Sequence, residues 1–311
     1  MKVILNALFI VILISGCNSK NIKTDIREDS DKTSSGIEKT STNLPYDLNK
    51  PTATYTLPEI LNEVSGLTFI DSAHVACIQD ELGSAFIYNL NNNSIVYEHK
   101  FDQDGDFEGV TYTRKSLYIL RSDGRLTEWG NFNVQTGGKE IQHTSPSIET
   151  ANNEGLCFDS LQNRLLIAGK SKPANNKSER FIYEYSLTKK EFKSKPAFRI
   201  NINELEKVAL SFNIEQKEYT KKGKLKPFNF RPSDLAVHPI TSDIYILSAA
   251  DNLLIVIDRN GNIKYISKLN SDLFPKAEGI AFSPNGTMLI SNEASGNVPT
   301  ILTFKFCPIK N

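Results

Sequence analysis

The sequence predicts an all-β protein, a five-bladed β-propeller built from four-stranded blades. The first observation is a repeat, an acidic residue followed by glycine and an apolar strand. It is intact at Glu108, Glu154 and Glu278 and degenerate at Ser65 and Ser233. The steps between these positions are 43, 46, 79 and 45 residues. A period in the forties with strand-like content is typical of propeller repeats.

The second observation is a succession of short alternating strands separated by turn residues. The first repeat unit contains apolar-alternating runs at residues 65–70, 74–80, 85–90 and 94–101. Asp, Asn, Gly and Ser lie between these runs and supply the backbone geometry that hairpins need. Each unit therefore has the size and the strand number of one propeller blade.

The last unit is one strand short, and an unpaired run before the first unit can complete it. Residues 53–57 read Ala-Thr-Tyr-Thr-Leu and have no partner within their own region. Pairing this run with the last blade would close the ring and remove a free sheet edge. A sixth blade would need about forty further residues with a repeat signature, and the chain does not contain them.

The N-terminus predicts export and a lipid anchor. Residues 1–16 form a signal peptide, with Lys2 followed by an apolar run that is short for a membrane span. The segment ends in Ile-Ser-Gly before Cys17, which resembles a bacterial lipobox and implies lipidation of Cys17. Residues 17–50 are polar and predict a disordered tether, so we assign 51–311 to the propeller.

One long step interrupts the repeat at residues 201–230, approximately. This insertion contains a helical pattern at 203–212 and the basic run Lys-Lys-Gly-Lys-Leu-Lys at 221–226. We expect either a lid over the central axis or a surface loop, and the sequence leaves both open.

The repeated acidic position predicts a calcium site. The first strand of a propeller blade lines the central axis, so one residue per blade converges there. Converging carboxylates repel one another unless a cation lies among them, and Ca²⁺ prefers six to eight oxygen ligands. The expected ligands are Glu108, Glu154, Glu278, Glu63 and Asp234, with Asp80, Glu81, Asp106, Asn153 and Glu293 as a surrounding shell. The alternative is that the glutamates only cap backbone amides.

Other site types find little support in the sequence. Charge is balanced at 36 basic and 36 acidic residues, which does not favour nucleic-acid binding. The acidic stretch from Asp102 lacks the glycine and the terminal glutamate of an EF-hand loop. No nucleophile elbow, zinc-protease motif, P-loop or dinucleotide fingerprint occurs. The sequence therefore favours a protein without enzymatic activity but does not decide the question. The cysteines after Cys17, at positions 77, 157 and 307, lie in apolar runs and are expected to be buried.

Several stretches in order resemble the SdiA-regulated family of bacterial envelope proteins. They are EVSGL, DFEGV, NEGLCF, PSDLAVHP and AEGIAFSPNGTMLISNEA, within residues 52–306. The resemblance implies a five-bladed propeller with a bound calcium ion and no established activity. The family is distantly similar to NHL-repeat propellers. Some of those are calcium-dependent hydrolases with ion ligands at the position of Glu108, Glu154 and Glu278.

We therefore expect a monomeric, lipid-anchored, calcium-binding propeller that binds a small ligand or an envelope protein. Its expected location is the bacterial cell envelope, outside the cytoplasm, at a membrane that the sequence does not specify. The alternative is a calcium-dependent hydrolase of lactones, esters or phosphoesters, with its site at the central axis. A third alternative is a scaffold that docks another envelope protein through the blade rims or the basic run.

Overall fold

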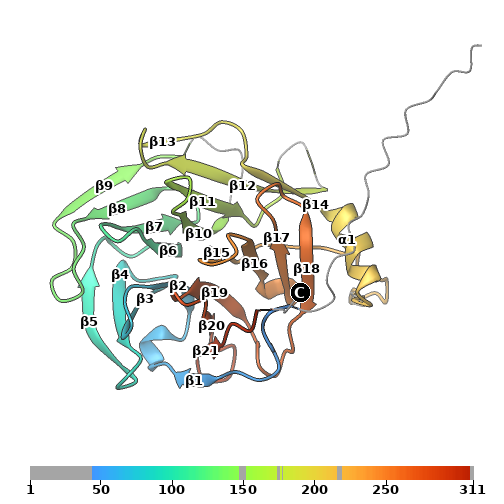
Figure 1. The fold of residues 1–311 in the computed structure, drawn as a ribbon, viewed down its shortest axis with the longest axis horizontal. Coiled ribbons are helices and arrows are strands. Elements are labelled where there is room, and N and C mark those ends of the chain that lie inside the picture. The colour runs from blue at the N-terminus through green and yellow to red at the C-terminus, as the bar shows by residue number, and fades with distance from the viewer. Residues whose placement is uncertain (1–43, 147–151, 174–175, 177, 216–218, 309–311) are drawn as a thin grey trace, which may run out of the picture. The chain divides into compact units, whose positions relative to one another are not determined.

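The structure, a computed structural model, describes residues 44–308 except 147–151, 174–175, 177 and 216–218. Five antiparallel sheets are arranged around a central axis (Figure 1), which confirms the predicted propeller. The predicted signal peptide, Cys17 and most of the predicted tether lie outside the described residues. Within the described residues, no helix is long and apolar enough to cross a membrane.

Each blade runs outward from the axis, strand by strand, in sequence order. The first has β2 (Val64–Phe69), β3 (His74–Gln79), β4 (Ser84–Asn89) and β5 (Ser94–Lys100); the second has β6 (Phe107–Tyr112), β7 (Leu117–Arg121), β8 (Leu126–Gly130) and β9 (Glu140–Thr144). The third has β10 (Asn153–Asp159), β11 (Arg164–Gly169) and β12 (Glu179–Ser186), and both β13 (Glu191–Phe192) and β14 (Phe198–Asn201) pair with β12. The fourth has β15 (Asp234–Val237), β16 (Ile244–Ser248), β17 (Leu253–Ile257) and β18 (Ile263–Lys268).

The fifth blade is closed by the N-terminal strand, as predicted. β19 (Ala277–Phe282), β20 (Met288–Asn292) and β21 (Thr300–Phe304) come from the end of the chain. β1 (Ala53–Thr56) adds as the outer strand, with Tyr55 opposite Ile301. The ladder satisfies backbone groups of β21 that would otherwise form an open edge.

The packed unit begins before residue 51, which corrects the expected end of the tether. Tyr46 and Leu48 are buried against the fourth and fifth blades, in a cluster that includes Tyr245 and Phe304. The hydroxyl of Tyr46 donates to the carbonyl of Gly286 at 2.6 Å. The polar residues before Tyr46 and Leu48 made this short apolar pattern hard to recognise in the sequence. The surface on which the two side chains pack forms only when the blades fold.

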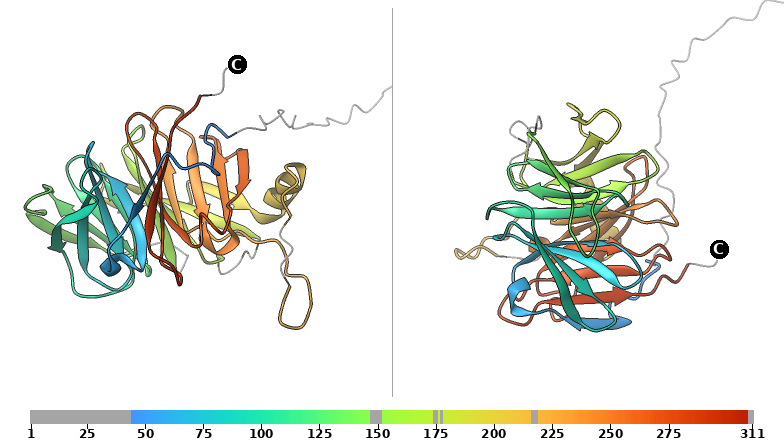
Figure 2. Two further views of the ribbon diagram at one scale, coloured as in Figure 1. Left: turned by 90° about the horizontal axis from the view of Figure 1, so that it is seen from below. Right: turned by 90° about the vertical axis from the view of Figure 1, so that its left-hand side faces the viewer.

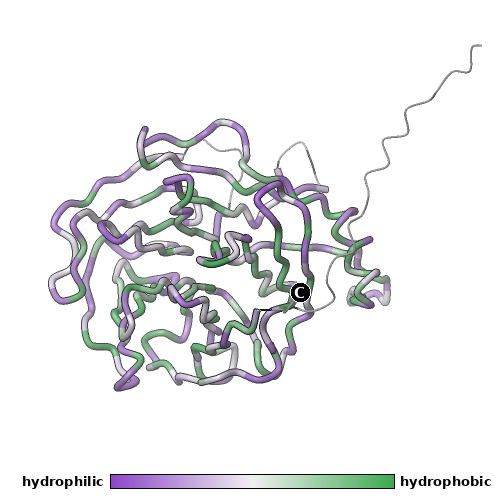
Figure 3. The backbone as a smooth tube through the Cα atoms, viewed as in Figure 1, coloured by the Kyte–Doolittle hydropathy of each residue, from purple (hydrophilic) through white to green (hydrophobic). Residues whose placement is uncertain are grey.

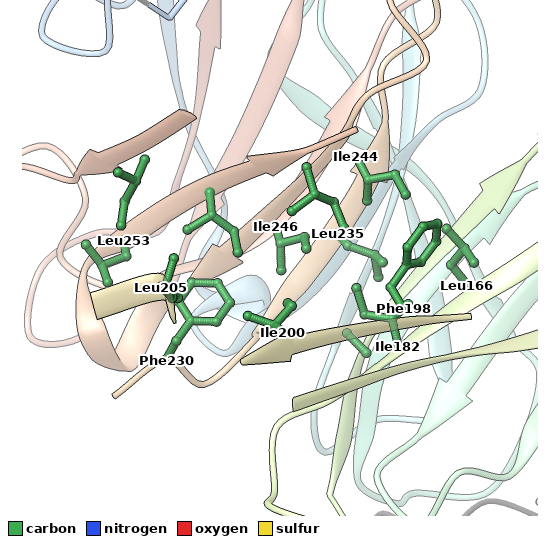
Figure 4. Packing of buried hydrophobic residues seen from close by; sticks show 14 of the residues in the cluster. Leu166, Ile182, Phe198, Ile200, Leu205, Phe230, Leu235, Ile244, Ile246 and Leu253 are labelled. Atoms are coloured by element: carbon green, nitrogen blue, oxygen red, sulfur yellow. The ribbon is translucent and has the colours of Figure 1, made fainter. Parts of the chain in front are cut away.

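The hydrophobic core lies between neighbouring blades rather than at the axis. Apolar side chains of adjacent sheets interdigitate, as Figure 4 shows for Phe198, Leu235 and Ile246 in the cluster between the third and fourth blades. The hydropathy colouring in Figure 3 shows apolar stretches along the strands and hydrophilic stretches at many of the connecting loops. The fully buried strand β17 is apolar throughout, and β16 is apolar up to Ser248 at its end, because both faces of these strands are covered.

The inner strands of all five blades begin on the same face of the propeller. We call the face on which β2, β6, β10, β15 and β19 begin the ring face. The antiparallel registers place the ends of the second strands on the same face, for example Gly169 opposite Asn153. β1 and β21 pair Ala53 with Thr303, so the first described residues and the C-terminal end lie on the opposite face.

The insertion contains one helix, α1 (Ile202–Ser211), close to the predicted residues 203–212. Asn201 caps it by accepting from the backbone amides of Asn203 and Glu204. Leu205 and Ala209 pack into the core between the third and fourth blades. Figure 1 shows α1 at the outer side of the molecule beside β14 and β18, so the helix does not cover the axis.

The basic run forms an exposed hairpin that projects from the body of the propeller (Figure 2). Tyr219 and Leu225 pair across it, and Gly223 turns the chain with φ of 73°. Both paired side chains are exposed, and so are the lysines between them. The structure therefore places the helix at the rim and leaves the basic run as a solvated projection.

The cysteines follow the sequence expectation in two of three places. Cys77 and Cys157 are free and buried, and burial raises the pKa of each thiol. Cys307 is free and exposed, because it lies beyond the end of β21, where the apolar run leaves the sheet.

Candidate functional site

The repeated acidic position is a β-bulge in the inner strand. The register between first and second strands shifts at Ser65, Glu108, Glu154 and Glu278, each time between the residue before it and the glycine after it. A bulged residue has no direct partner and turns its side chain away from the regular alternation. The bulge is therefore the local feature that turns each glutamate out of its ladder.

The glycine after the bulge is needed for the close approach of neighbouring inner strands. A Cβ on Gly109 would lie 2.7 Å from the Cβ of Leu156 and 2.9 Å from the carbonyl oxygen of Glu154. A Cβ on Gly155 would lie 3.0 Å from the Cα of Asp234 in the next blade. The Glu-Gly pair thus combines a packing role for glycine with a site role for the acid.

Serine replaces glutamate at two ring positions and links blades. Ser65 donates to the carbonyl of Phe107 at 2.7 Å, and Ser233 donates to the carbonyl of Ala277 at 3.0 Å. Each accepting residue directly precedes the ring glutamate of the next blade, Glu108 or Glu278. The serines therefore hold the neighbouring bulges in place instead of adding charge to the ring.

Glu154 is buried and paired with a lysine. Its carboxylate lies 2.5 Å from the Lys170 ammonium, and Asn152 donates to the same oxygen at 3.1 Å. Burial raises the pKa of Glu154 to about 7, although the hydrogen bond and charge of Lys170 act in the opposite direction. Burial also lowers the pKa of Lys170, but the bond to Glu154 outweighs it and the net change is upward.

Glu278 and Glu293 share a second lysine. The Lys276 ammonium lies 2.5 Å from Glu293 and 3.4 Å from Glu278. Both carboxylates are buried, and burial raises the pKa of Glu293 to about 7 despite its hydrogen bond with Lys276. Glu293 follows the second strand of the fifth blade, and the shared lysine joins it to the ring glutamate Glu278.

Glu108 differs from the other ring glutamates because it has no cationic partner. Among the described residues it accepts no hydrogen bond and forms no ion pair. Burial raises its pKa to about 9, and the charges of Glu154, Asp106 and Glu278 add to the increase. The charge of Lys170 acts in the opposite direction. Glu108, Glu154 and Glu278 occupy the equivalent bulge in the inner strands of three blades around the axis.

Asp234 holds three blades together. It is fully buried, and its two oxygens accept from the backbone amides of Leu156 at 3.2 Å and Ile280 at 2.8 Å. These amides belong to the inner strands on either side of β15. Burial raises the pKa of Asp234. Its oxygens are thus engaged by backbone donors, and the side chain links the blades around the axis.

The remaining predicted acids gather at the edge of the ring face between the first, second and fifth blades. Burial raises the pKa of Asp80, and the charges of Glu63 and Glu81 contribute to the increase. One oxygen of Asp80 is buried without a hydrogen-bond partner, whereas Glu63, Glu81 and Asp106 are exposed. Asn153 is buried, and its amide donates to the carbonyl of Ser122 at 3.3 Å.

The two lysines are the site residues that sequence reasoning missed. Lys170 follows the second strand of the third blade, where the other units vary, and Lys276 lies two residues before Glu278. Both occupy positions that recur from blade to blade: Lys170 corresponds to Asp80, Ser122 and Glu293, and Lys276 corresponds to Glu63, Asp106 and Asn152. The residue type differs between blades at these positions, so a search for repeated carboxylates did not single out the lysines.

The described ring residues provide few free ligands for the expected calcium ion. Among the described residues, no group of three or more His, Cys, Asp or Glu side chains is placed to hold a metal ion. Lys170 and Lys276 occupy the oxygens of Glu154, Glu278 and Glu293 instead. Glu108 does fit a hard cation, because it is an unpaired carboxylate among like charges.

The described histidines lie away from this ring. His238 is buried on the opposite face, where its Nε2 is 2.8 Å from the Tyr46 hydroxyl, and burial lowers its pKa to about 4. His74, His99 and His143 lie on second or outer strands. No histidine is thus available as a general base beside the ring carboxylates.

A separate pocket of about 490 Å³ lies between the insertion and the third and fourth blades. Asn203, Phe228, Arg231 and Asp251 are among its lining residues, and Arg231 pairs with Asp251 at 2.9 Å. None of the ring glutamates lines this pocket.

Comparison with known proteins agrees with this architecture. The SdiA-regulated family profile matches residues 46–297. The chain belongs to the SdiA-regulated family. No curated protein sequence matches it.

Solved propellers resemble this member of the SdiA-regulated family in fold. The glutaminyl cyclase of Myxococcus xanthus is 13% identical with a TM-score of 0.54, covering 84% of this chain and 97% of that one. The virginiamycin B lyase of Staphylococcus aureus is 14% identical with a TM-score of 0.44, covering 81% and 69%. At 13% identity the likeness to the glutaminyl cyclase concerns the fold alone.

Proposed function

We propose that this SdiA-regulated protein is a lipid-anchored binding module of the bacterial cell envelope that takes one divalent cation, Ca²⁺, at its axis. The observation that carries the proposal is Glu108, a partly buried carboxylate that forms no ion pair among the described residues and lies among other carboxylates. Such a group is stabilised by a hard cation. Glu108 would hold the ion, with Glu154 and Glu278 on either side.

When bound, the ion would supply positive charge to the ring in addition to that of Lys170 and Lys276. The protein's own residues orient the ligands: the bulges direct the carboxylates, and Ser65, Ser233 and Asp234 fix the inner strands. Residues of this type on rigid strands form a pre-organised site. The ring face then offers a charged surface to a small ligand or to an envelope protein.

The test is a thermal melt of the purified protein in EDTA and in excess Ca²⁺, together with metal analysis. We expect a higher melting temperature with Ca²⁺ and a loss of this increase in the Glu108→Gln, Glu278→Gln double variant. Glu98→Gln, on an exposed outer strand, is the matched control. Equal melts of the wild type in both buffers would remove the cation from the proposal.

The lipid anchor has its own test. Cys17→Ala is expected to move the protein from the membrane fraction to the soluble fraction of the cell envelope. The reason is that two acyl chains bury enough methylene groups for stable attachment, whereas the described residues contain no membrane-spanning helix. Continued membrane association of the variant would contradict the lipidation.

A metal-dependent hydrolase is the second candidate. Three carboxyl groups with raised pKa values, Glu108, Glu154 and Glu293, lie in one region, which is a common feature of catalytic sites. The absence of a histidine beside them among the described residues favours the binding module. Turnover of lactone, ester or phosphoester substrates that disappears in EDTA and in Glu108→Gln would favour the hydrolase.

A further inference from the structure

Two ammonium groups already occupy the ring where the cation is proposed. Lys170 lies 2.5 Å from Glu154, and Lys276 lies 2.5 Å from Glu293 and 3.4 Å from Glu278. The lysines come from different blades, because Lys170 follows β11 of the third blade and Lys276 precedes β19 of the fifth. All three contacted carboxylates are buried.

A divalent cation and an ammonium group compete for the same carboxylate oxygens. Glu108 alone offers at most two oxygens, whereas Ca²⁺ takes about six to eight oxygen ligands. Recruiting Glu154 therefore requires Lys170 to leave, and recruiting Glu278 requires Lys276 to shift. The Lys170 and Lys276 side chains are 30% and 43% exposed, so each has room to turn toward solvent.

We infer that Lys170 and Lys276 are built-in counter-cations that compete with the divalent ion and set its affinity for the ring. The inference rests on the proposed function, because it concerns the same carboxylates. It also gives the ring a state without metal, in which Lys170 pairs with Glu154, and Lys276 pairs with Glu278 and Glu293. The folded blades then do not depend on the ion, and the ion concentration decides whether Glu154 and Glu278 face a lysine or a metal.

The experiment is calorimetric titration of the full-length protein with CaCl₂ after EDTA treatment. We expect Lys170→Met and Lys276→Met each to tighten the dissociation constant by about tenfold or more, since each removes a positive charge that pairs with a carboxylate the ion would need. Lys264→Met is the control. Its ammonium is 40% exposed and pairs with Asp243 at 2.8 Å, away from the ring. Its binding should equal that of the wild type.

The outcomes separate this inference from the proposed function. Wild-type binding with unchanged or weaker affinity in both ring variants overturns the inference and leaves the calcium site standing. Binding only in the variants supports the inference and shows that lysines have replaced the native ion. No binding in any protein overturns both. Because a methionine variant can fail to fold, Lys170→Arg and Lys170→Gln form a second pair, in which only the neutral Gln should bind more tightly than the wild type.

Discussion

Substituting Glu108 by glutamine in the absence of metal should stabilise the protein in a pH-dependent way. The pKa of Glu108 is about 9 in the folded chain and 4.5 without the fold. Its contribution to stability is therefore fully present below pH 4.5 and is lost as the pH rises toward 9, because the unfolded chain releases the proton first. Glutamine keeps the shape of the neutral side chain and loses nothing.

The size of the effect follows from the proton linkage. Each tenfold change in proton affinity corresponds to about 1.4 kcal/mol. Between pH 5 and pH 8 the wild type therefore loses up to about 4 kcal/mol relative to Glu108→Gln. We expect about half of this, roughly 2 kcal/mol, because solvent at the ring face screens the partly exposed group.

The assay is urea denaturation in EDTA at pH 5 and pH 8, with the difference in unfolding free energy between variant and wild type as the readout. The exposed Glu98→Gln variant should show the same difference at both pH values. An excess of Ca²⁺ should reverse the order at pH 8 by stabilising the wild type. If the Glu108→Gln difference is the same at both pH values, or grows toward low pH, the reasoning about burial at this position is refuted.

Two further predictions concern the scaffold of the ring. Asp234→Ala should lower the unfolding free energy by about 2–4 kcal/mol, because it leaves the buried amides of Leu156 and Ile280 without acceptors; equal denaturation midpoints would contradict this linking role. Gly109→Ala should cost about 1–3 kcal/mol through steric overlap with the neighbouring inner strand. Gly130→Ala, whose new Cβ would meet nothing nearer than 3.6 Å, is the control and should cost far less in the same assay.

Part of the candidate site could be predicted because it repeats. Glu108, Glu154 and Glu278 share one position in three blades, and a shared position in a ring implies convergence at the axis. The same logic did not extend to Asp234, one residue beyond the repeated position. A buried aspartate can bind a metal or accept from backbone amides, and only the positions of Leu156 and Ile280 distinguish these roles.

The lysines illustrate the opposite case. Lys170 and Lys276 occupy positions where other blades carry acids such as Asp80 and Asp106, so the pattern of repeated carboxylates did not mark them. Their effect depends on distances between side chains of different blades, which sequence spacing does not contain. The position of α1 at the rim could not be predicted for the same reason. Its apolar side chains were visible in the sequence, but the groove between β14 and β18 that receives them forms only when two blades pack.

The sequence by itself determined the blade number, the strand order and the closure by residues 53–57. These properties depend on local alternation and on a period of forty-odd residues, which are carried by the chain directly. Tertiary structure alone decided the state of the ring: which carboxylates are paired, which one is left alone, and which aspartate holds the blades. Those outcomes depend on burial and on contacts between residues far apart in the chain, such as Asp234 with Leu156 and Ile280.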